Sequence, residues 1–235
     1  MSNYQPNMKI AKIIHQTWIG GAPIPYHIYR KSWIDSWPLL HPDWERKFWT
    51  DEDTDALVKE HYPKFYDCYQ RLAVPVKKAD FARLLYLHRF GGVYVDLDFL
   101  CLKNLCPLLQ EYDIVLGRLS PDHPAYQIPN AFLSSSPGCD FWLQVAEEIA
   151  SACPEEQVSV EMHTGPVRLE RAYARYAPPN SVIYGDKLIY AVDWIDLLRP
   201  DKRPFAVSLR TKKPEELEAL FPASYCITFW VHNWT

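Results

Sequence analysis

The stretch FGGVYVDLD at residues 90–98 decides the fold of this chain, because it ends a helix, forms a short strand and places two carboxylates after it. Gly91 and Gly92 interrupt the helical pattern before them, and the apolar, β-rich run that follows is typical of a buried strand. Asp96 and Asp98 are two residues apart, which puts both side chains on one face of an extended backbone. Such carboxylates raise each other's pKa unless a divalent cation neutralises them, and oxygen ligands favour Mg²⁺ or Mn²⁺. The stretch therefore predicts a metal site.

The pair of aspartates is also compatible with two different roles. Both could cap turns in a loop. The signature of Mg²⁺-dependent phosphatases also has two aspartates after an apolar strand, but Leu100 stands where that signature needs Thr or Val. A further aspartate is also expected four residues after Asp186, and Tyr190 occupies that place. The phosphatase is therefore the weaker alternative.

The segments around residues 90–98 alternate between strand and helix patterns. The other expected strands are 12–18, 44–49, 113–117, 131–134, 182–184, 188–190 and 225–231, and the expected helices are 26–37, 51–60, 75–90, 139–151 and 166–176. Residues 199–214 are interpreted as a Pro-rich, cationic loop. Repeated βα units predict an α/β fold, a Rossmann-like, mainly parallel sheet with helices on both faces. Ligands of such sheets bind beyond the carboxyl ends of the strands.

Composition bounds the class of protein. With 235 residues, 48% of them hydrophobic, the chain has enough core for a single domain over residues 1–235. The net charge of −4, without a basic stripe, argues against a nucleic-acid partner. Nine tryptophans and fifteen tyrosines favour a small molecule with a nucleobase or a sugar ring, since aromatic faces stack on both.

The cysteines and the apolar segments bear on the compartment. Six cysteines occur without a CxxC pair or a zinc-type spacing, which predicts free thiols. No secretory signal is visible, and no early apolar stretch approaches the roughly 20 residues of a membrane span. We therefore expect a cytoplasmic protein without a transmembrane segment. The cationic residues in 199–214 leave a peripheral contact with an anionic or lipid-linked acceptor open, although a solvated basic loop is the simpler interpretation.

Asp80 and Arg83 lie three residues apart on one face of the helix that precedes the metal candidate. The plain interpretation is an i,i+3 ion pair that stabilises the helix by about 0.2–0.5 kcal/mol. The functional interpretation is that both side chains reach a ligand, the carboxylate accepting from sugar hydroxyls and the guanidinium donating to hydroxyl or phosphate.

Three further residues are candidates by position. His15 and Trp18 come at the end of the first strand, where they are placed for a nucleobase, although buried His and Trp are as common in cores. His232 follows the last expected strand and offers a nitrogen ligand to a metal, although chain ends usually fray.

These motifs, in this order, resemble the DXD-containing sugar transferases of glycosyltransferase family 32, the group of the fungal initiating α-1,6-mannosyltransferases and mannosyl-inositol-phosphoceramide synthases. The likeness covers most of the chain and is most specific in its middle block. The motifs are IIHQTW at 13–18, KADFAR at 78–83, LHRFGGVYVDLD at 87–98, NAF at 130–132, TGP at 164–166 and the terminal His232. Clostridial glucosylating toxins are distantly similar over the same elements, including WIGG at 18–21.

The resemblance implies a GT-A fold and transfer of a sugar from a nucleotide donor with retention of anomeric configuration. It implies Mn²⁺ or Mg²⁺ as cofactor and gives each motif residue a role. Asp96, Asp98 and His232 would hold the metal, Asp80 and Arg83 would grip the donor sugar, and His15, Trp18, Tyr94, Asn130 and Trp234 would contact the nucleotide sugar.

The expected function is that of a metal-dependent hexosyltransferase. GDP-mannose is the favoured donor, UDP-glucose or UDP-galactose comes next, and the acceptor is a glycan, a glycolipid or a protein. A non-catalytic module that binds a nucleotide sugar or a glycan is the main alternative, and a Mg²⁺-dependent phosphatase the lesser one. Golgi relatives begin with a membrane anchor that is not visible here, so a bacterial or viral enzyme, or a truncated one, fits better than an intact Golgi one.

Overall fold

The computed structural model describes residues 8–121, 123, 125–153, 158–185 and 187–231. Its centre is a six-stranded sheet in the order β2-β1-β3-β6-β5-β7. The strands are β1 (Ile13–Thr17), β2 (Glu45–Trp49), β3 (Gly92–Val95), β5 (Ile114–Gly117), β6 (Phe132–Ser135) and β7 (Ser181–Tyr184). β1 pairs in parallel with β2 and β3, and β5 with β7, whereas β6 is antiparallel to both β3 and β5. The prediction of a mainly parallel sheet is therefore confirmed, with β6 as the reversed strand.

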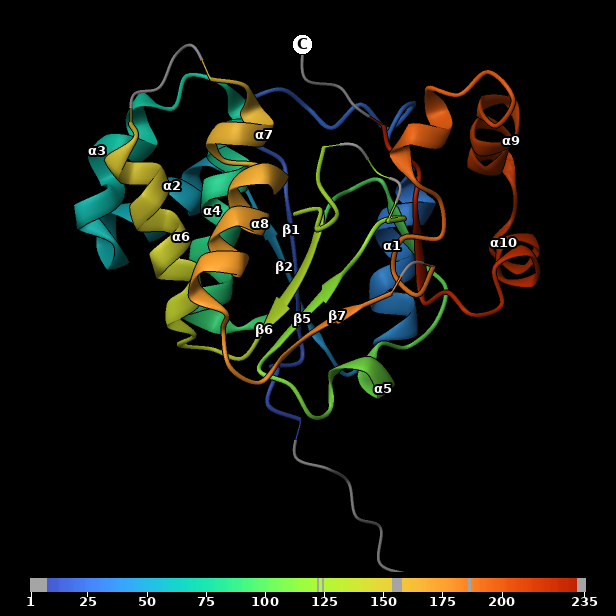
Figure 1. Cartoon of the computed structure of the whole chain (residues 1–235), viewed down its shortest axis with the longest axis horizontal. Helices are drawn as coiled ribbons and strands as arrows, with labels where there is room; N and C mark the ends of the chain where they lie inside the picture. The colour runs from blue at the N-terminus through green and yellow to red at the C-terminus, as the bar shows by residue number, and fades with distance from the viewer. Residues whose placement is uncertain (1–7, 122, 124, 154–157, 186, 232–235) are drawn as a thin grey trace, which may run out of the picture.

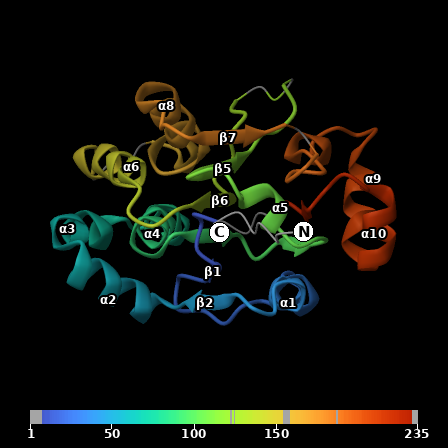
Figure 2. The same ribbon diagram turned by 90° about the horizontal axis from the view of Figure 1, so that it is seen from below.

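Helices cover both faces of this sheet, as predicted (Figures 1 and 2). One face carries α2 (Asp51–His61), α3 (Pro63–Arg71), α4 (Pro75–Phe90), α6 (Asp140–Ser151) and α8 (Pro166–Tyr176). The other face carries α1 (Lys31–Leu40), α9 (Arg203–Ser208) and α10 (Pro214–Leu220). The buried apolar side chains form separate clusters, with Trp142 in one and Trp37 in the next. The remaining short elements are α5 (Cys106–Leu109), α7 (Val160–His163), and the 3₁₀ turns η1 (Trp194–Leu197) and η2 (Leu209–Thr211).

A second sheet of two strands joins distant parts of the chain. β4 (Phe99–Cys101) follows β3 after a tight turn and pairs with β8 (Cys226–Thr228) in antiparallel fashion. Residues 225–231 are thereby brought back beside the turn that holds the two aspartates. All six cysteines are free, as the spacing predicted.

Several helix and strand bounds follow from local signals that the sequence shows. Thr50 caps α2 with a reciprocal box, its side chain accepting from Asp53 N–H while the Asp53 carboxylate accepts from Thr50 N–H. Pro75 opens α4 at its first turn, and Gly91 ends it with φ +64°. Ten of the sixteen residues of α4 are buried, since the helix packs between the sheet and its neighbours.

Four expectations about local structure are wrong. The helix expected from residue 26 begins at Lys31, because Pro25 leads first into a turn closed by Ile28 and Tyr29 N–H. Residues 188–190 form no strand, and α3 was not expected. The expected loop at 199–214 contains α9 and η2, since Pro204 takes a first-turn position where no N–H is needed.

Gly92 is the residue on which the pairing of β1 and β3 depends. It has φ +93°, and a Cβ placed there would lie 2.5 Å from the carbonyl oxygen of Ile13. We expect Gly92→Ala to lower the free energy of unfolding by about 2 kcal/mol or more, which lowers the melting temperature by roughly 2–4 °C per kcal/mol. Gly185→Ala is the matched control, because its Cβ would meet nothing within 4 Å. Equal melting temperatures for the two variants would contradict this prediction.

Candidate active site

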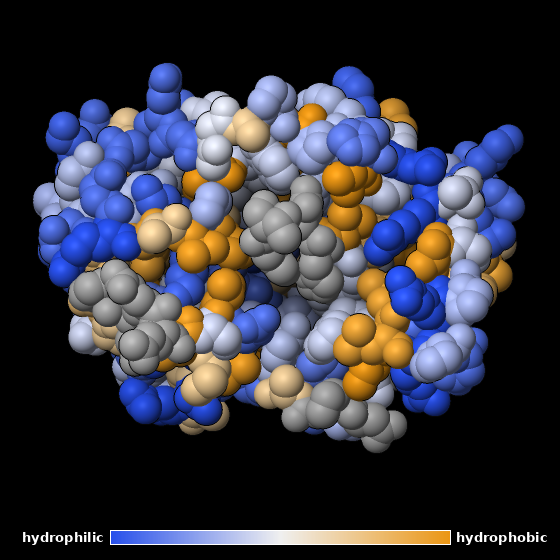
Figure 3. Space-filling model, turned by 90° about the horizontal axis from the view of Figure 1, so that it is seen from above, coloured by the Kyte–Doolittle hydropathy of each residue, from blue (hydrophilic) through white to orange (hydrophobic). Residues whose placement is uncertain are grey.

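A cavity of about 530 Å³ opens at the edge of the sheet where the parallel strands β1 and β3 end. Figure 3 looks onto this edge and shows the molecule hollowed near its centre. The lining comes from the segments 17–25, 74–83, 94–98, 126–131, 160–166 and 230–231. The cavity thus lies where the topology of a parallel sheet predicts a ligand.

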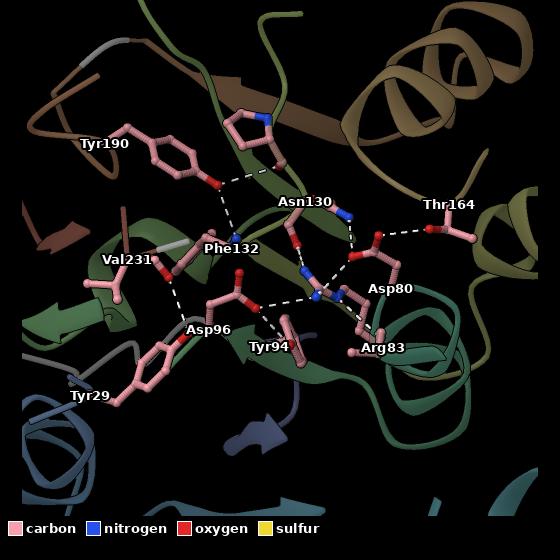
Figure 4. Close-up of polar contacts among 12 residues, drawn as sticks. Tyr29, Asp80, Arg83, Tyr94, Asp96, Asn130, Phe132, Thr164, Tyr190 and Val231 are labelled. Carbon is pink, nitrogen blue, oxygen red and sulfur yellow. Dashed lines mark hydrogen bonds and ion pairs between the residues drawn. The ribbon is translucent and has the colours of Figure 1, made fainter. Parts of the chain in front are cut away.

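Arg83 stands at the floor of this cavity, buried on α4 between two carboxylates (Figure 4). Its Nη2 lies 3.0 Å from Asp80 Oδ1 and 3.4 Å from Asp96 Oδ1. Nη1 donates to the Asn130 carbonyl at 2.5 Å, and the guanidinium lies 4.4 Å from the centre of the Tyr94 ring. A buried cation needs such partners, because unpaired burial of a charge costs several kcal/mol. The predicted i,i+3 ion pair is confirmed, but it is buried and part of a larger network.

Asp80 is held from three sides. Its Oδ1 accepts from Asn130 Nδ2 at 2.8 Å, and its Oδ2 accepts from Thr164 Oγ1 at 2.9 Å. Burial raises the pKa of this carboxyl to about 6, against the opposing effect of Arg83. Both oxygens are occupied, so Asp80 is suited to orienting a ligand rather than to attacking one.

Asp96 and Asp98 both line the cavity, as the motif predicted, but not by way of an extended backbone. β3 ends at Val95, and a turn closed by Phe99 N–H and the Asp96 carbonyl carries the two aspartates. Asp96 Oδ1 accepts from Tyr94 Oη at 2.8 Å, and Figure 4 shows its second oxygen turned away from Arg83. Asp98 Oδ2 accepts from Val231 N–H at 2.7 Å.

The donor set fits a divalent cation. The second oxygen of each aspartate makes no hydrogen bond to another residue of the described chain, and carboxylate oxygens are the ligands that Mg²⁺ and Mn²⁺ prefer. Burial, followed by the charge of Asp96, raises the pKa of Asp98 to about 7, so this site holds more negative charge than its surroundings neutralise. Within the described residues no cluster of three or more metal-ligating side chains occurs, so these two oxygens would need further ligands from the bound substrate or beyond residue 231.

The other half of the cavity is apolar. Trp18, Pro23, Pro25, Val74 and Pro75 line it, and a Cβ on Gly20 would lie 3.3 Å from Pro75. Trp18 Nε1 donates to the Ala22 carbonyl at 2.6 Å, which fixes the ring. A flat apolar slot beside a charged floor matches a nucleoside diphosphate sugar, which has a flat base at one end and an anionic diphosphate next to the sugar.

The loop that carries this slot is anchored by Asp51, at the first turn of α2. Its carboxylate accepts from Gly20 N–H at 3.1 Å and from Gly21 N–H at 2.9 Å. Both glycines have positive φ, +123° and +71°, which other residues adopt with strain.

His15 is a correction, because the structure does not bring it to the cavity. Its Nδ1 accepts from Trp49 Nε1 at 3.0 Å, and its Nε2 lies 2.8 Å from the Gly91 carbonyl. Burial lowers the pKa of His15 to about 4, so the ring is neutral and Nε2 donates. His15 therefore supports the backbone at Gly91 rather than a nucleobase.

The remaining predicted residues divide into two groups. Trp18, Tyr94 and Asn130 line the cavity, as do Asp80, Arg83, Asp96 and Asp98. His232 and Trp234 lie outside the described residues, so their proposed contacts with the metal and the donor stay predictions.

Sequence reasoning missed other residues at this site. Tyr29, Tyr126 and Trp230 line the cavity, and Thr164 binds Asp80, although the sequence analysis assigned no role to Thr164. The TGP motif at 164–166 was the available signal for Thr164. No local pattern marks Trp230, because β8 brings it to the site from far along the chain.

The fold of the chain is of the GT-A type, and solved glycosyltransferase structures share it. The UDP-bound glycosyltransferase domain from the YGT toxin aligns with a TM-score of 0.51 and 11% identity, over 77% of this chain and 80% of that one. The GT-A prediction and the distant likeness to glucosylating toxins are thereby confirmed at the level of the fold.

The sequence comparisons find similar proteins of one kind. Residues 29–115 match the glycosyltransferase sugar-binding region containing DXD motif, which confirms the resemblance inferred from the motifs. The mannosyl phosphorylinositol ceramide synthase CSH1 of Saccharomyces cerevisiae is 35% identical over 61% of this chain and 36% of its own. The inositol phosphoceramide mannosyltransferase 3 of Schizosaccharomyces pombe is 37% identical over 60% of this chain and 37% of its own. The chain thus spans little more than a third of these curated relatives.

Both lines of comparison therefore find similarity to glycosyltransferases. None of the described helices is long and apolar enough to cross a membrane.

The raised pKa values of two carboxyls in the site predict how pH and Mn²⁺ affect the stability of the protein. Asp80 and Asp98, with pKa values of about 6 and about 7 instead of 3.8, keep their protons in the folded state after the unfolded chain has released them. This contribution is fully present below the unfolded-state pKa of 3.8 and is lost as the pH rises through the folded-state values, so the metal-free melting temperature should fall between about pH 4 and pH 7. Mn²⁺ should raise it at pH 8 and have little effect at pH 5, where protons occupy the carboxyls.

Thermal unfolding in chelator and in Mn²⁺ measures this difference. Asp98→Asn has no proton to release and should flatten the metal-free dependence and reduce the Mn²⁺ effect. A Mn²⁺ shift of the same size at both pH values would contradict the prediction.

Proposed function

We propose that this chain, as a single catalytic domain, is a metal-dependent, retaining hexosyltransferase that uses GDP-mannose, with UDP-glucose or UDP-galactose as the next donors. The observation that carries the proposal is the convergence of Asp80, Arg83, Asp96 and Asp98 on one cavity that has an apolar slot beside them. Mannose is favoured because the relatives at 35% and 37% identity are named for mannosyl transfer.

Each group of cavity residues has its own proposed role in the reaction. Asp96 and Asp98 would hold Mn²⁺ or Mg²⁺ through their free oxygens, and such a cation stabilises the charge that grows on a leaving diphosphate. Asp80, fixed by Thr164 and Asn130, accepts from hydroxyls of the donor sugar and sets its orientation. Trp18 and its apolar neighbours take the base.

None of the three aspartates of the cavity is proposed as an enzymic nucleophile. Asp80 is engaged through both oxygens, and Asp96 and Asp98 are assigned to the metal. The acceptor hydroxyl can attack the anomeric carbon of the donor sugar from the same face that the diphosphate leaves. This route retains the configuration and needs no enzymic nucleophile. Retention itself rests on the family resemblance, and NMR of the anomeric proton in the product tests it.

Donor hydrolysis tests the proposed reaction. GDP-mannose, UDP-glucose, UDP-galactose and UDP-N-acetylglucosamine are compared in Mn²⁺ and in chelator, and GDP-mannose in Mn²⁺ should be hydrolysed fastest. Asp98→Asn should lower that rate by about 10²-fold or more, since it removes a metal ligand. Asp201→Asn, at an exposed aspartate outside the cavity lining, should leave the rate unchanged.

The alternatives give distinct results in the same experiment. Binding of donor and metal without turnover would identify a non-catalytic module. Release of phosphate from simple esters, with indifference to sugar nucleotides, would identify a phosphatase.

We further propose that the acceptor is a lipid-linked glycan held at a membrane surface. Leu198, Phe205 and Val207 are 63%, 51% and 41% exposed, an unusual set of apolar side chains for one short segment. α9 lies near the same edge of the molecule as the cavity (Figure 1), and orange and blue atoms are interspersed on that side in Figure 3. Arg203 makes no ion pair with any described residue. Apolar and cationic side chains together suit an anionic lipid surface.

Sedimentation with vesicles tests the acceptor class. The protein should sediment with phosphatidylcholine vesicles that contain phosphatidylinositol more than with phosphatidylcholine alone. The double variant F205S/V207S should lose most of this binding and keep the hydrolysis of soluble donor, because neither side chain lines the cavity. Unchanged vesicle binding in the double variant would exclude this surface, and the acceptor could then be a soluble glycan or a protein.

A further inference from the structure

The carboxylate of Asp98 is held by a segment that comes much later in the chain. Phe229 N–H donates to the Asp98 carbonyl at 3.0 Å, and Val231 N–H donates to Asp98 Oδ2 at 2.7 Å. Tyr29 Oη donates to the Val231 carbonyl at 3.2 Å, a contact drawn in Figure 4. The orientation of Asp98 therefore depends on the backbone of residues 229–231.

Trp230, between these two donors, has a conformation that bulky residues avoid. Its φ is +48°, in the left-handed region, which costs about 1–3 kcal/mol at a residue with a large side chain. In this conformation the N–H groups of Phe229 and Val231, on either side of Trp230, both reach Asp98. Strain of this kind persists where the surroundings determine the backbone more strongly than its own preference.

Side-chain contacts of Trp230 account for part of that restraint. The indole Nε1 donates to the Val192 carbonyl at 2.8 Å, and the ring stacks on Tyr190 with centroids 5.6 Å apart. Trp230 N–H donates to Thr228 Oγ1 at 3.3 Å. These contacts fix the ring and the amide of Trp230.

Arg210 binds the carbonyl groups of Phe229 and Trp230. Its Nη2 donates to the Phe229 carbonyl at 2.8 Å and to the Trp230 carbonyl at 3.3 Å. The side chain reaches them from η2, which is seated by buried Leu209 in the same apolar cluster as Phe229. Arg210 makes no ion pair with any described residue, and its buried Nε has no hydrogen-bond partner, so its polar contacts are directed at this backbone.

We propose that Arg210 is a positioning residue for the active site: it keeps Trp230 left-handed, so that Val231 N–H stays on Asp98 Oδ2 and the other Asp98 oxygen stays available to a cation. The role rests on the proposed function, since that cation is the one assigned to Asp96 and Asp98. Asp98 also faces the Arg210 guanidinium, whose positive charge favours the ionised carboxylate.

Direct metal binding distinguishes this role from a merely structural one. The dissociation constant of Mn²⁺, measured from the paramagnetic resonance of free Mn²⁺ with GDP present, should rise about 10–100-fold in Arg210→Met, the range for residues that orient metal ligands. Arg210→Lys keeps the charge and loses the planar guanidinium. Its Mn²⁺ dissociation constant should lie between those of Arg210→Met and the native protein. Arg71→Met, at an exposed arginine at the end of α3 and outside the cavity lining, should match the native protein.

A double variant isolates the route through Asp98. Arg210→Met should add little to the loss of Mn²⁺ affinity already caused by Asp98→Asn, because both act on one ligand. A lower melting temperature in Arg210→Met with unchanged Mn²⁺ affinity, or full additivity with Asp98→Asn, would overturn the proposal.

Hydrogen exchange at the Val231 amide tests the contact without metal. In Arg210→Lys the metal-free protein should exchange this proton at least about tenfold faster than the native protein, while amides of β3 keep their rates. This measurement decides the matter if Arg210→Met does not fold. It also separates two failures: a native protein that binds no Mn²⁺ refutes the metal in the proposed function, whereas unchanged exchange at Val231 refutes the role of Arg210.

Discussion

The buried guanidinium of Arg83 is the constraint on which the rest of the site depends. A cation in the interior is stable only with partners on fixed elements, and here those partners are Asp80 on α4 and Asp96 after β3. The two elements can meet at this distance because Gly91 and Gly92 turn the chain between them without a side chain that would strike Pro137 or Ile13. The close packing of α4, the glycine turn and β3 therefore determines where the charged side chains of the cavity lie.

The reversed strand β6 brings a further partner of Asp80 and Arg83 to the site. In a parallel sheet, the residues that follow each strand gather at one edge, and those that precede a strand lie at the opposite edge. Because β6 is antiparallel to β3, the residues before it come to the ligand edge instead. Asn130 reaches Asp80 and Arg83 for this reason, and Asp96 N–H pairs with the Ala131 carbonyl.

Much of this could be predicted from local patterns, and the exceptions have physical causes. The bounds of α4 and the end of β3 follow from Pro75 and the two glycines, which act within their own segment. His15 could not be placed from sequence, since a neutral ring that packs on Trp49 and one that packs on a base look the same there. The helices in 199–214 were missed because proline in a first turn resembles proline in a loop. The partners of Asp98 could not be found at all, because they depend on the pairing of β4 with β8.

That pairing also has a consequence for biosynthesis. Asp98 and Val231 are 133 positions apart, so the ribosome adds the second partner long after the first. At about 5–20 residues per second, the gap is roughly 7–27 s. Throughout that interval the helices and strands of the nascent chain can form, but Asp98 lacks the backbone donor that orients it. The sheet can therefore form in a partly made chain before the two aspartates reach the arrangement that the complete fold gives them.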